Sequence, residues 1–106
     1  MGTAQNWTDA DGNPAGGEVT GVGLWISWQN GPLGRVGTEE RIPPNGAFVE
    51  DVLKAALQRL EFYNASQFRC RENSLAITKI EEALFWLQAR TSRREVQNVE
   101  GTHEGS

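Results

Sequence analysis

The chain has 106 residues, a formal net charge of -4 at pH 7 and 38% hydrophobic residues. A chain of this length folds as one domain at most, with a modest core that we expect association with copies of itself to reinforce. The negative charge argues against general binding of duplex nucleic acid, which needs many lysine and arginine contacts to phosphates. The single cysteine, Cys70, excludes an intrachain disulfide, and the single histidine excludes a cluster of imidazole ligands. We therefore predict no metal site and no cofactor.

The chain contains no apolar stretch near the roughly 20 residues that span a bilayer. Its first residues lack the charged start and apolar run of an export signal. We expect a protein that stays in the cytoplasm and does not contact a membrane.

Residues 1–20 are rich in Gly, Asn, Asp and Thr, with Trp7 as their large apolar group. This composition offers little apolar surface to offset the entropy lost on ordering. We predict that this segment is a flexible N-terminal tail.

Residues 21–44 are predicted to form a β-hairpin. Leu24, Ile26 and Trp28 alternate with more polar neighbours, which is the period of a strand with one buried face. The cluster at residues 30–34 contains Asn, Gly and Pro and predicts a turn. A second short strand is expected over residues 35–42. Such a hairpin is too small to be stable alone and must pack on helices or pair with another chain.

Residues 45–98 are predicted to form an antiparallel helical hairpin. Asn45 follows two prolines and is a candidate N-cap for a first helix that ends near Tyr63. A loop then leads to a second helix that starts near Glu72 or Asn73 and ends at residues 96–99. The second helix has apolar residues at spacings of three and four, in a stripe that we expect to continue toward Arg90 and Arg94: Ala76, Ile77, Ile80, Ala83, Leu84 and Leu87.

The predicted fold is therefore α+β, with a small antiparallel sheet and a two-helix hairpin. Residues 21–106 are expected to form a single domain that oligomerises, with residues 99–106 as a polar C-terminal tail.

Three arginines, Arg90, Arg93 and Arg94, lie within two turns of the second helix. They could simply complement the negative end of the helix dipole. They could bind nucleic acid, which the acidity of the chain disfavours. They could also bind a small phosphorylated ligand, because Arg90 and Arg94 are one turn apart and guanidinium groups match phosphate geometry.

The spacing between Asn73 and Arg90 bears on this third interpretation. Seventeen residues separate them, which in a helix amounts to roughly 25 Å. A small ligand cannot reach both, so a shared pocket requires the antiparallel helix of a second chain. The hairpin brings Phe62 and Tyr63 to the end that carries Asn73. An aromatic face, an amide and guanidinium groups together suit a nucleotide.

Other residues favour structural roles. Trp25 and Trp28 are more typical of core or interface aromatics than of stacking platforms, and Phe85 and Trp86 widen the apolar surface beyond what one partner helix covers. No nucleophile with a matching base is present, which favours a binding protein over an enzyme.

Four stretches carry a family resemblance: WQNGPLGR, NGAFVEDVLKAALQRLEFYN, FRCRENSLAITKIEEALFWLQARTSRRE and VEGTH. Together they cover roughly residues 22–103 and resemble phage proteins of the Thoeris anti-defense protein 1 family, which share a helical hairpin domain with anti-CBASS protein 2. The resemblance implies a sponge that binds cyclic ADP-ribose isomers made by Thoeris TIR proteins in the cytoplasm of the infected bacterial host and does not degrade them. Some members also hold cyclic di- or trinucleotides, and members assemble as homodimers or homohexamers with pockets between chains.

The resemblance also implies site residues. The family's pocket asparagine corresponds to Asn73, its aromatic residue to Tyr63 or the adjacent Phe62, and its two helix arginines to Arg90 and Arg94. Arg35 is a further match. Tight binding needs an enclosed pocket, and the glycine-rich turn or the tail through His103 could provide a mobile lid. The alternative is a non-catalytic structural or protein-interaction module of a phage. The full set of candidate ligand-binding residues is Asn73, Arg90, Arg94, Tyr63, Phe62, Arg35, Arg71, Thr102 and His103.

Overall fold

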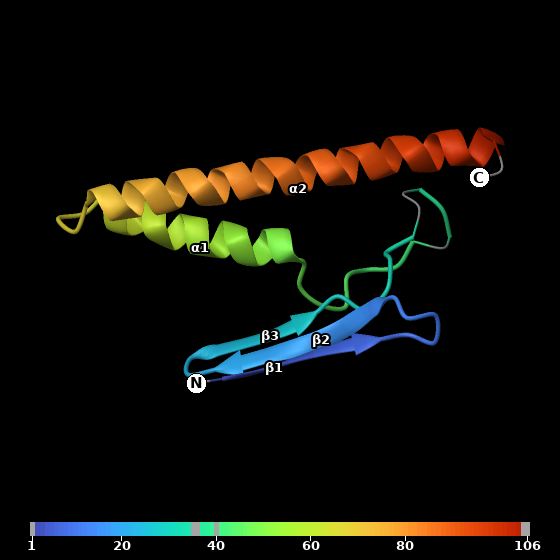
Figure 1. Cartoon of the computed structure of the whole chain (residues 1–106), viewed down its shortest axis with the longest axis horizontal. Helices are drawn as coiled ribbons and strands as arrows, with labels where there is room; N and C mark the ends of the chain where they lie inside the picture. Colours follow the sequence, from blue (N-terminus) through green and yellow to red (C-terminus); the bar gives the residue numbers. More distant parts are fainter. Residues whose placement is uncertain (1, 35–36, 40, 105–106) are drawn as a thin grey trace. The chain divides into compact units, whose positions relative to one another are not determined.

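The computed structural model describes residues 2–34, 37–39 and 41–104, with side chains described as far as Arg93. The chain forms two compact units, Met1–Val49 and Glu50–Ser106. The first unit contains a three-stranded sheet and the second contains two helices (Figure 1). The α+β class predicted from the sequence is confirmed. The domain boundaries drawn from the sequence stay a prediction.

The sheet of the first unit is antiparallel, with strands β1 (Thr3–Thr8), β2 (Pro14–Gly21) and β3 (Leu24–Trp28) in sequence order. Val19 in β2 pairs with Ala4 on one side and with Ile26 on the other. Every residue of β1 is exposed, so this strand is held by its backbone pairing with β2 rather than by a buried face.

The prediction of a flexible tail over residues 1–20 was wrong, because β1 and most of β2 lie there. A tight turn makes the pairing possible. The carboxylate of Asp9 accepts hydrogen bonds from the backbone N–H groups of Asp11 and Asn13, at 2.9 and 3.0 Å. Gly12 supplies the positive φ of 83° that the turn needs. The local turn chemistry thus replaces the apolar surface that these strands lack.

The strand predicted over Leu24–Trp28 is confirmed, but its partner differs from the prediction. β3 pairs with β2, and the described part of residues 35–42, which leaves out Arg35, Val36 and Glu40, contains no strand. The positive φ values predicted for the glycines at residues 30–34 are present, 79° at Gly31 and 90° at Gly34, but this segment contains a bend at Gly31 and no hydrogen-bonded turn.

Asn45 is not the N-cap of the first helix, contrary to the prediction, because α1 (Val49–Asn64) begins four residues later. Asn45 instead joins the segment before α1 to the end of β3. Its side-chain oxygen accepts a hydrogen bond from the backbone N–H of Asn30, and its amide nitrogen donates to the carbonyl of Asn30, at 2.7 and 3.0 Å. Its own backbone N–H donates to the side chain of Gln29 at 2.8 Å.

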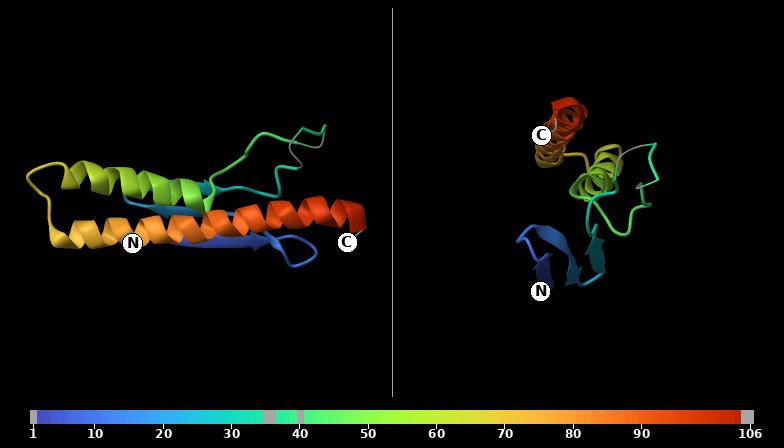
Figure 2. Two further views of the ribbon diagram at one scale, coloured as in Figure 1. Left: turned by 90° about the horizontal axis from the view of Figure 1, so that it is seen from above. Right: turned by 90° about the vertical axis from the view of Figure 1, so that its right-hand side faces the viewer.

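The second unit is an antiparallel pair of helices, α1 and α2 (Arg71–Glu104), which run side by side in Figures 1 and 2. The predicted stripe on α2 is half-buried at every apolar position from Ala76 to Leu87. The predicted end of this helix at residues 96–99 was wrong, since α2 continues to Glu104. Arg, Glu and Gln at residues 93–97 are good helix formers, so adding turns costs little once the helix has started.

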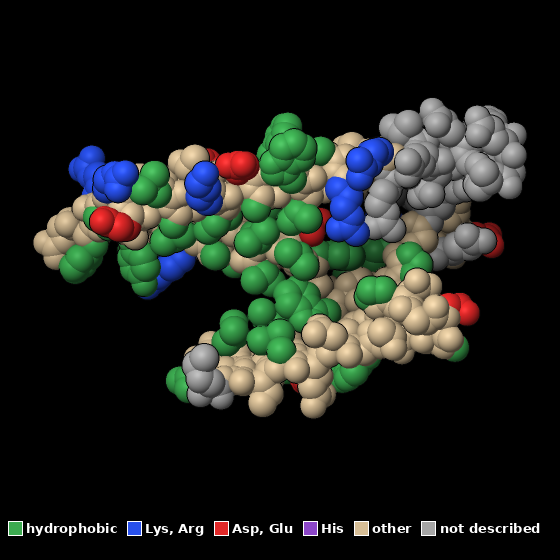
Figure 3. Space-filling view, viewed as in Figure 1, with side chains coloured by type: hydrophobic (Ala, Val, Ile, Leu, Met, Phe, Trp, Pro, Cys, Tyr) green, Lys and Arg blue, Asp and Glu red, His purple; other side chains and the backbone are tan. Residues whose placement is uncertain are grey.

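No described hydrophobic side chain is fully buried. Large apolar groups instead remain exposed on the helical unit, including Phe85 and Trp86 at 64% each. Hydrophobic side chains are visible on the surface of the helices in Figure 3. Among the described residues, no helix is long and apolar enough to cross a membrane.

Candidate functional site

Asn64 organises the turn between the two helices. Its side-chain oxygen accepts a hydrogen bond from the backbone N–H of Cys70 at 3.2 Å, and its amide nitrogen donates to the hydroxyl of Ser74 at 2.9 Å. The hydroxyl of Ser74 is also within 3.3 Å of the carbonyl oxygen of Cys70, to which it donates. One half-buried amide therefore connects the end of α1, the loop and the first turn of α2. We call this region, residues 62–74, the closed end of the hairpin.

Asn73 lies in the closed end, as predicted. Its side-chain amide nitrogen donates to the carbonyl oxygen of Phe68 at 3.3 Å, and its backbone N–H points to the sulfur of Cys70 at 3.4 Å. Among the described residues, no hydrogen bond reaches the side-chain oxygen of Asn73. The amide nitrogen of Asn73 is therefore bonded to the loop, and its side-chain oxygen is available to another molecule.

Cys70 occupies the position immediately before α2, where serine, threonine, aspartate and asparagine are preferred. Its sulfur accepts the N–H of the third helical residue, Asn73. This is the geometry of an N-cap, made here with a weak sulfur acceptor.

Tyr63 and Phe62 lie at the same end of the hairpin as Asn73, which confirms their predicted placement at the end of α1. Their ring centroids are 6.3 Å apart and the ring planes are tilted by 51°. Phe62 is 57% exposed and Tyr63 39% exposed. Both rings are therefore accessible to another molecule as stacking surfaces. Arg71, the first residue of α2, is also exposed at this end.

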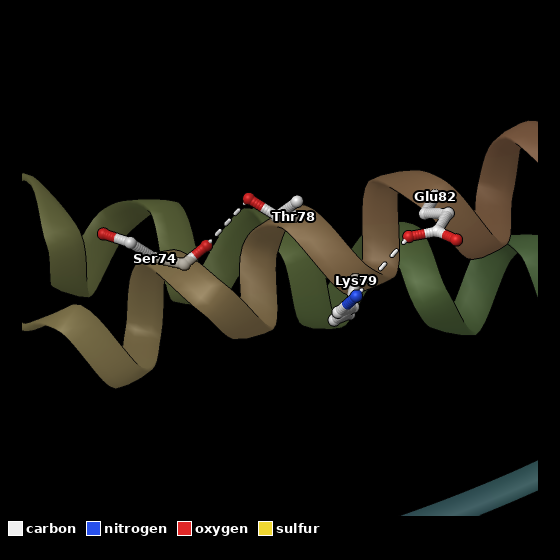
Figure 4. Close-up of polar contacts among 4 residues, drawn as sticks. All are labelled: Ser74, Thr78, Lys79 and Glu82. Atoms are coloured by element: carbon white, nitrogen blue, oxygen red, sulfur yellow. Dashed lines mark hydrogen bonds and ion pairs between the residues drawn. The ribbon is translucent and has the colours of Figure 1, made fainter.

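α2 is one uninterrupted helix from Arg71 to Glu104. Side chains follow the i, i+3 and i, i+4 spacing of a regular helix, with the Thr78 hydroxyl donating to the Ser74 carbonyl at 3.1 Å and Lys79 paired with Glu82 at 3.7 Å (Figure 4). The Thr91 hydroxyl donates to the Leu87 carbonyl in the same way at 3.1 Å. Nothing in this stretch bends or breaks the helix.

Arg90 and Arg93 are exposed in the C-terminal half of α2, fourteen and eleven residues before its last residue, Glu104. Arg90 does not continue the half-buried stripe as predicted. Seventeen residues at about 100° each place it roughly 100° around the helix from Asn73. Within one chain, α2 separates Arg90 from Asn73 by roughly 25 Å. The side chains of four further candidate residues lie outside the described residues: Arg35, Arg94, Thr102 and His103.

Sequence reasoning missed two residues, one in the closed end and one that precedes it in α1. Arg59 lies over the rings of both Phe62 and Tyr63, and Asn64 holds the turn. The spacing of Arg59, three and four residues before the two aromatic residues, is a signal that could have revealed it. Among the described residues, no group of three or more His, Cys, Asp or Glu side chains could hold a metal ion.

The fold and this arrangement define a small α+β chain whose helical hairpin carries aromatic and amide side chains at its closed end and exposed arginines in the C-terminal half of α2. The family model described as "Acb2/Tad1, hairpin domain" matches residues 26–92. The chain belongs to the Acb2/Tad1 hairpin-domain family. It is also similar to a protein of Bacillus phage SBSphiJ7 named Thoeris anti-defense 1, with 46% identity over 79 residues, or 74% of this chain. That region is 51% of the relative, so the chain spans about half the length of the curated relative it matches.

Proposed function

We propose that this protein is a phage anti-defense sponge that binds cyclic ADP-ribose isomers, the signals of the bacterial Thoeris system, and holds them without degrading them. Membership of the hairpin-domain family and the name of the relative in Bacillus phage SBSphiJ7 support this assignment. The site of action would be the cytoplasm of the infected host.

The continuity of α2 carries the proposal. Asn73 lies in the first turns of the helix and Arg90 lies seventeen residues later, without a break between them. A ligand the size of a cyclic dinucleotide cannot reach both in one chain. The proposed pocket therefore lies between two copies, with α2 of one copy antiparallel to α2 of the other, so that Arg90 and Arg94 of one chain approach Asn73 and Tyr63 of its partner.

Each residue has a definite chemical role in this pocket. The ring of Tyr63 stacks on adenine, and the free side-chain oxygen of Asn73 accepts a hydrogen bond from the base or a ribose hydroxyl. The guanidinium groups of Arg90 and Arg94 neutralise the pyrophosphate. Nanomolar capture needs about -12 kcal/mol. Two or three charge-assisted hydrogen bonds of about 1.5 to 3 kcal/mol each, with base stacking, reach that value only in an enclosed and preorganised pocket.

Self-association of the chain, as a homodimer or homohexamer, is part of the proposal. The described residues include no fully buried hydrophobic side chain. Phe85 and Trp86 form an exposed aromatic pair with ring centroids 5.4 Å apart. Burying such rings against another copy would supply apolar surface that a single chain lacks.

Calorimetry with cyclic ADP-ribose and its glycocyclic isomers tests the proposal, and cyclic di- and trinucleotides belong in the same panel as a second ligand class. We expect at least one cyclic ADP-ribose isomer to bind and to be recovered intact after the complex is heated. Recovery of a hydrolysed product would identify an enzyme instead.

The exposed aromatic pair favours a second candidate function, a non-catalytic structural or protein-interaction module. Failure to bind any nucleotide in the calorimetric panel, with the fold intact, would support that function over the sponge.

A further inference from the structure

Arg59 forms a cluster with the two aromatic residues at the end of α1. The guanidinium carbon of Arg59 lies 5.1 Å from the ring centroid of Phe62 and 4.9 Å from that of Tyr63. The three residues occur at i, i+3 and i+4, so they occupy neighbouring positions on one face of the helix. All three side chains are exposed. The cluster is therefore open to a ligand.

Arg59 and Phe62 lie on the side of α1 away from the half-buried residues Leu53, Leu57, Leu60 and Asn64, and Tyr63 lies between the two sides. The half-buried Val52, seven residues before Arg59, lies close to Arg59 around the helix, so the cluster adjoins the packed face. The exposure of Arg59 and Phe62 is thus a property of one side of the helix, and packing of the hairpin does not require an arginine there.

Arg59 has no ion-pair partner among the described residues. The ion pair that these residues form joins Lys79 and Glu82. A guanidinium group that stacks on aromatic rings uses its face and keeps the N–H groups at its edge for hydrogen bonds. Contact with two rings also restricts the side chain before any ligand arrives, which reduces the entropy lost on binding. Arg59 is therefore a positioned cation with unused donors.

We propose that Arg59 is a further ligand-binding residue, whose guanidinium edge donates hydrogen bonds to a phosphate oxygen of a nucleotide that stacks on Tyr63. This proposal rests on the proposed function for the stacking role of Tyr63. The ligand class is an adenine nucleotide with a pyrophosphate, because the cluster offers a ring face and a planar pair of donors next to each other. Arg59 would act from the same chain as Tyr63, whereas Arg90 and Arg94 would act from the partner.

The first test compares the affinity of variants for the cyclic ADP-ribose isomer that binds the wild-type protein. Arg59→Gln should weaken binding by about tenfold or more, the loss expected for a charge-assisted hydrogen bond. Arg59→Lys keeps the charge but loses the planar donors, so it should also weaken binding, by a smaller factor. Lys54→Gln is the matched control, since it removes the same charge from an exposed position of the same helix, and it should leave the affinity unchanged.

The second test needs no cyclic nucleotide. The side-chain Nε–H resonance of Arg59 is followed by NMR while inorganic pyrophosphate is added to the wild-type protein, with Lys54→Gln as a control for general charge effects. We expect a saturable shift of this resonance that survives in Lys54→Gln. Circular dichroism of Arg59→Gln should match the wild-type spectrum, because the side chain is exposed.

The outcomes separate the two proposals. Unchanged affinity of Arg59→Gln and Arg59→Lys for a cyclic ADP-ribose isomer that the wild type binds would overturn the role of Arg59 and leave the sponge intact. A protein that binds no cyclic ADP-ribose isomer, yet shows the saturable pyrophosphate shift at Arg59, would overturn the sponge and retain the anion site. Absence of a shift with pyrophosphate and with every isomer would overturn the role of Arg59.

Discussion

The side-chain amide of Asn64, the last residue of α1, donates a hydrogen bond to the hydroxyl of Ser74 in α2, with 2.9 Å between the two atoms. The same side chain accepts the backbone N–H of Cys70 at 3.2 Å. Both polar groups of one amide are thus used to fix the chain reversal between the helices. The position of Asn73, one residue before Ser74, depends on this arrangement.

Replacing Asn64 by alanine should therefore destabilise the hairpin. The change removes the acceptor of the Cys70 N–H and one of the two hydrogen bonds of the Ser74 hydroxyl, at a cost of about 0.5 to 1.5 kcal/mol for each bond because both groups are exposed. Thermal unfolding followed by circular dichroism should show a lower midpoint. Gln67→Ala is the matched control, because Gln67 lies in the same loop and is exposed. Equal midpoints for the two variants would show that the Asn64 contacts do not stabilise the turn.

Cys70→Ser should raise the stability of the protein. A hydroxyl is a stronger acceptor than a thiol and serine is among the preferred N-cap residues, so the bond from the Asn73 N–H should strengthen. Cys70→Ala should lower the stability by about 0.5 to 2 kcal/mol relative to Cys70→Ser. Urea denaturation of the three proteins under reducing conditions measures the order. If alanine were as stable as serine, Cys70 would not act as an N-cap.

A pocket shared between chains predicts complementation. Asn73→Ala and Arg90→Ala should each abolish ligand binding, since each removes one half of every pocket. When the two variants are unfolded, mixed and refolded together, mixed oligomers should contain pockets with Asn73 from one chain and Arg90 from the other, and calorimetry should detect restored sites. Each variant refolded alone is the control. A mixture that stays inactive, although mass spectrometry shows mixed oligomers, would contradict a pocket built from two chains.

The exposed aromatic pair predicts a test of association. Trp86→Ser, alone or with Phe85→Ser, should lower the oligomeric state or raise the concentration needed for assembly, because about 25 cal/mol is lost for each Å² of apolar surface no longer buried. Sedimentation velocity over a range of concentrations provides the measurement. Lys79→Ala, at another exposed position of α2, should leave assembly unchanged. Assembly unaffected by both aromatic substitutions would place the contact between copies elsewhere.

The close approach of β1 to Gly17 can be tested by substitution. Gly17 is buried, has a φ of 149°, and a Cβ atom there would overlap the backbone oxygen of Gln5 on the paired strand. Gly17→Ala should therefore weaken the pairing of β1 with β2, which hydrogen exchange of the amides in these strands would detect. At Gly21 the Cβ of Leu24 lies 3.9 Å from an added Cβ, so Gly21→Ala is the control. Equal exchange in the two variants would contradict the close approach at Gly17.

The helices could be predicted because their apolar residues repeat at three and four. Ile77, Ile80 and Leu84 are half-buried where the periodicity places them. The far end of α2 was missed because the polar residues after Arg94 carry no apolar pattern, although they can continue a helix that has already formed. The end of a helix therefore depends more on the helix propensity of its last residues than on the apolar stripe.

The sheet was only partly predictable. Leu24, Ile26 and Trp28 alternate with more polar neighbours in the sequence, and that strand was found, although only Ile26 and Trp28 of the three are half-buried and Leu24 is exposed. β1 has no alternation to detect, since all its residues are exposed. The pair Asp11 and Gly12 was the available signal, because this dipeptide is typical of a hairpin turn.

The candidate site was predictable at the level of helix ends but not of contacts. Spacing alone placed Tyr63 and Asn73 at one end of the hairpin and Arg90 seventeen residues after Asn73 along α2. The sulfur contact of Cys70 and the stacking of Arg59 depend on loop geometry and side-chain rotamers, which a sequence pattern does not specify.

The unbroken course of α2 limits which mutations this protein can accept during evolution. One residue inserted between Ser74 and Arg90 would move the arginines by about 1.5 Å and swing them by about 100°. Substitutions in this stretch are therefore tolerable where insertions and deletions are not, unless they come in numbers close to whole turns. Adaptation to a larger or smaller signal would then proceed by shifting the register between neighbouring copies, while the number of residues in the helix stays constant.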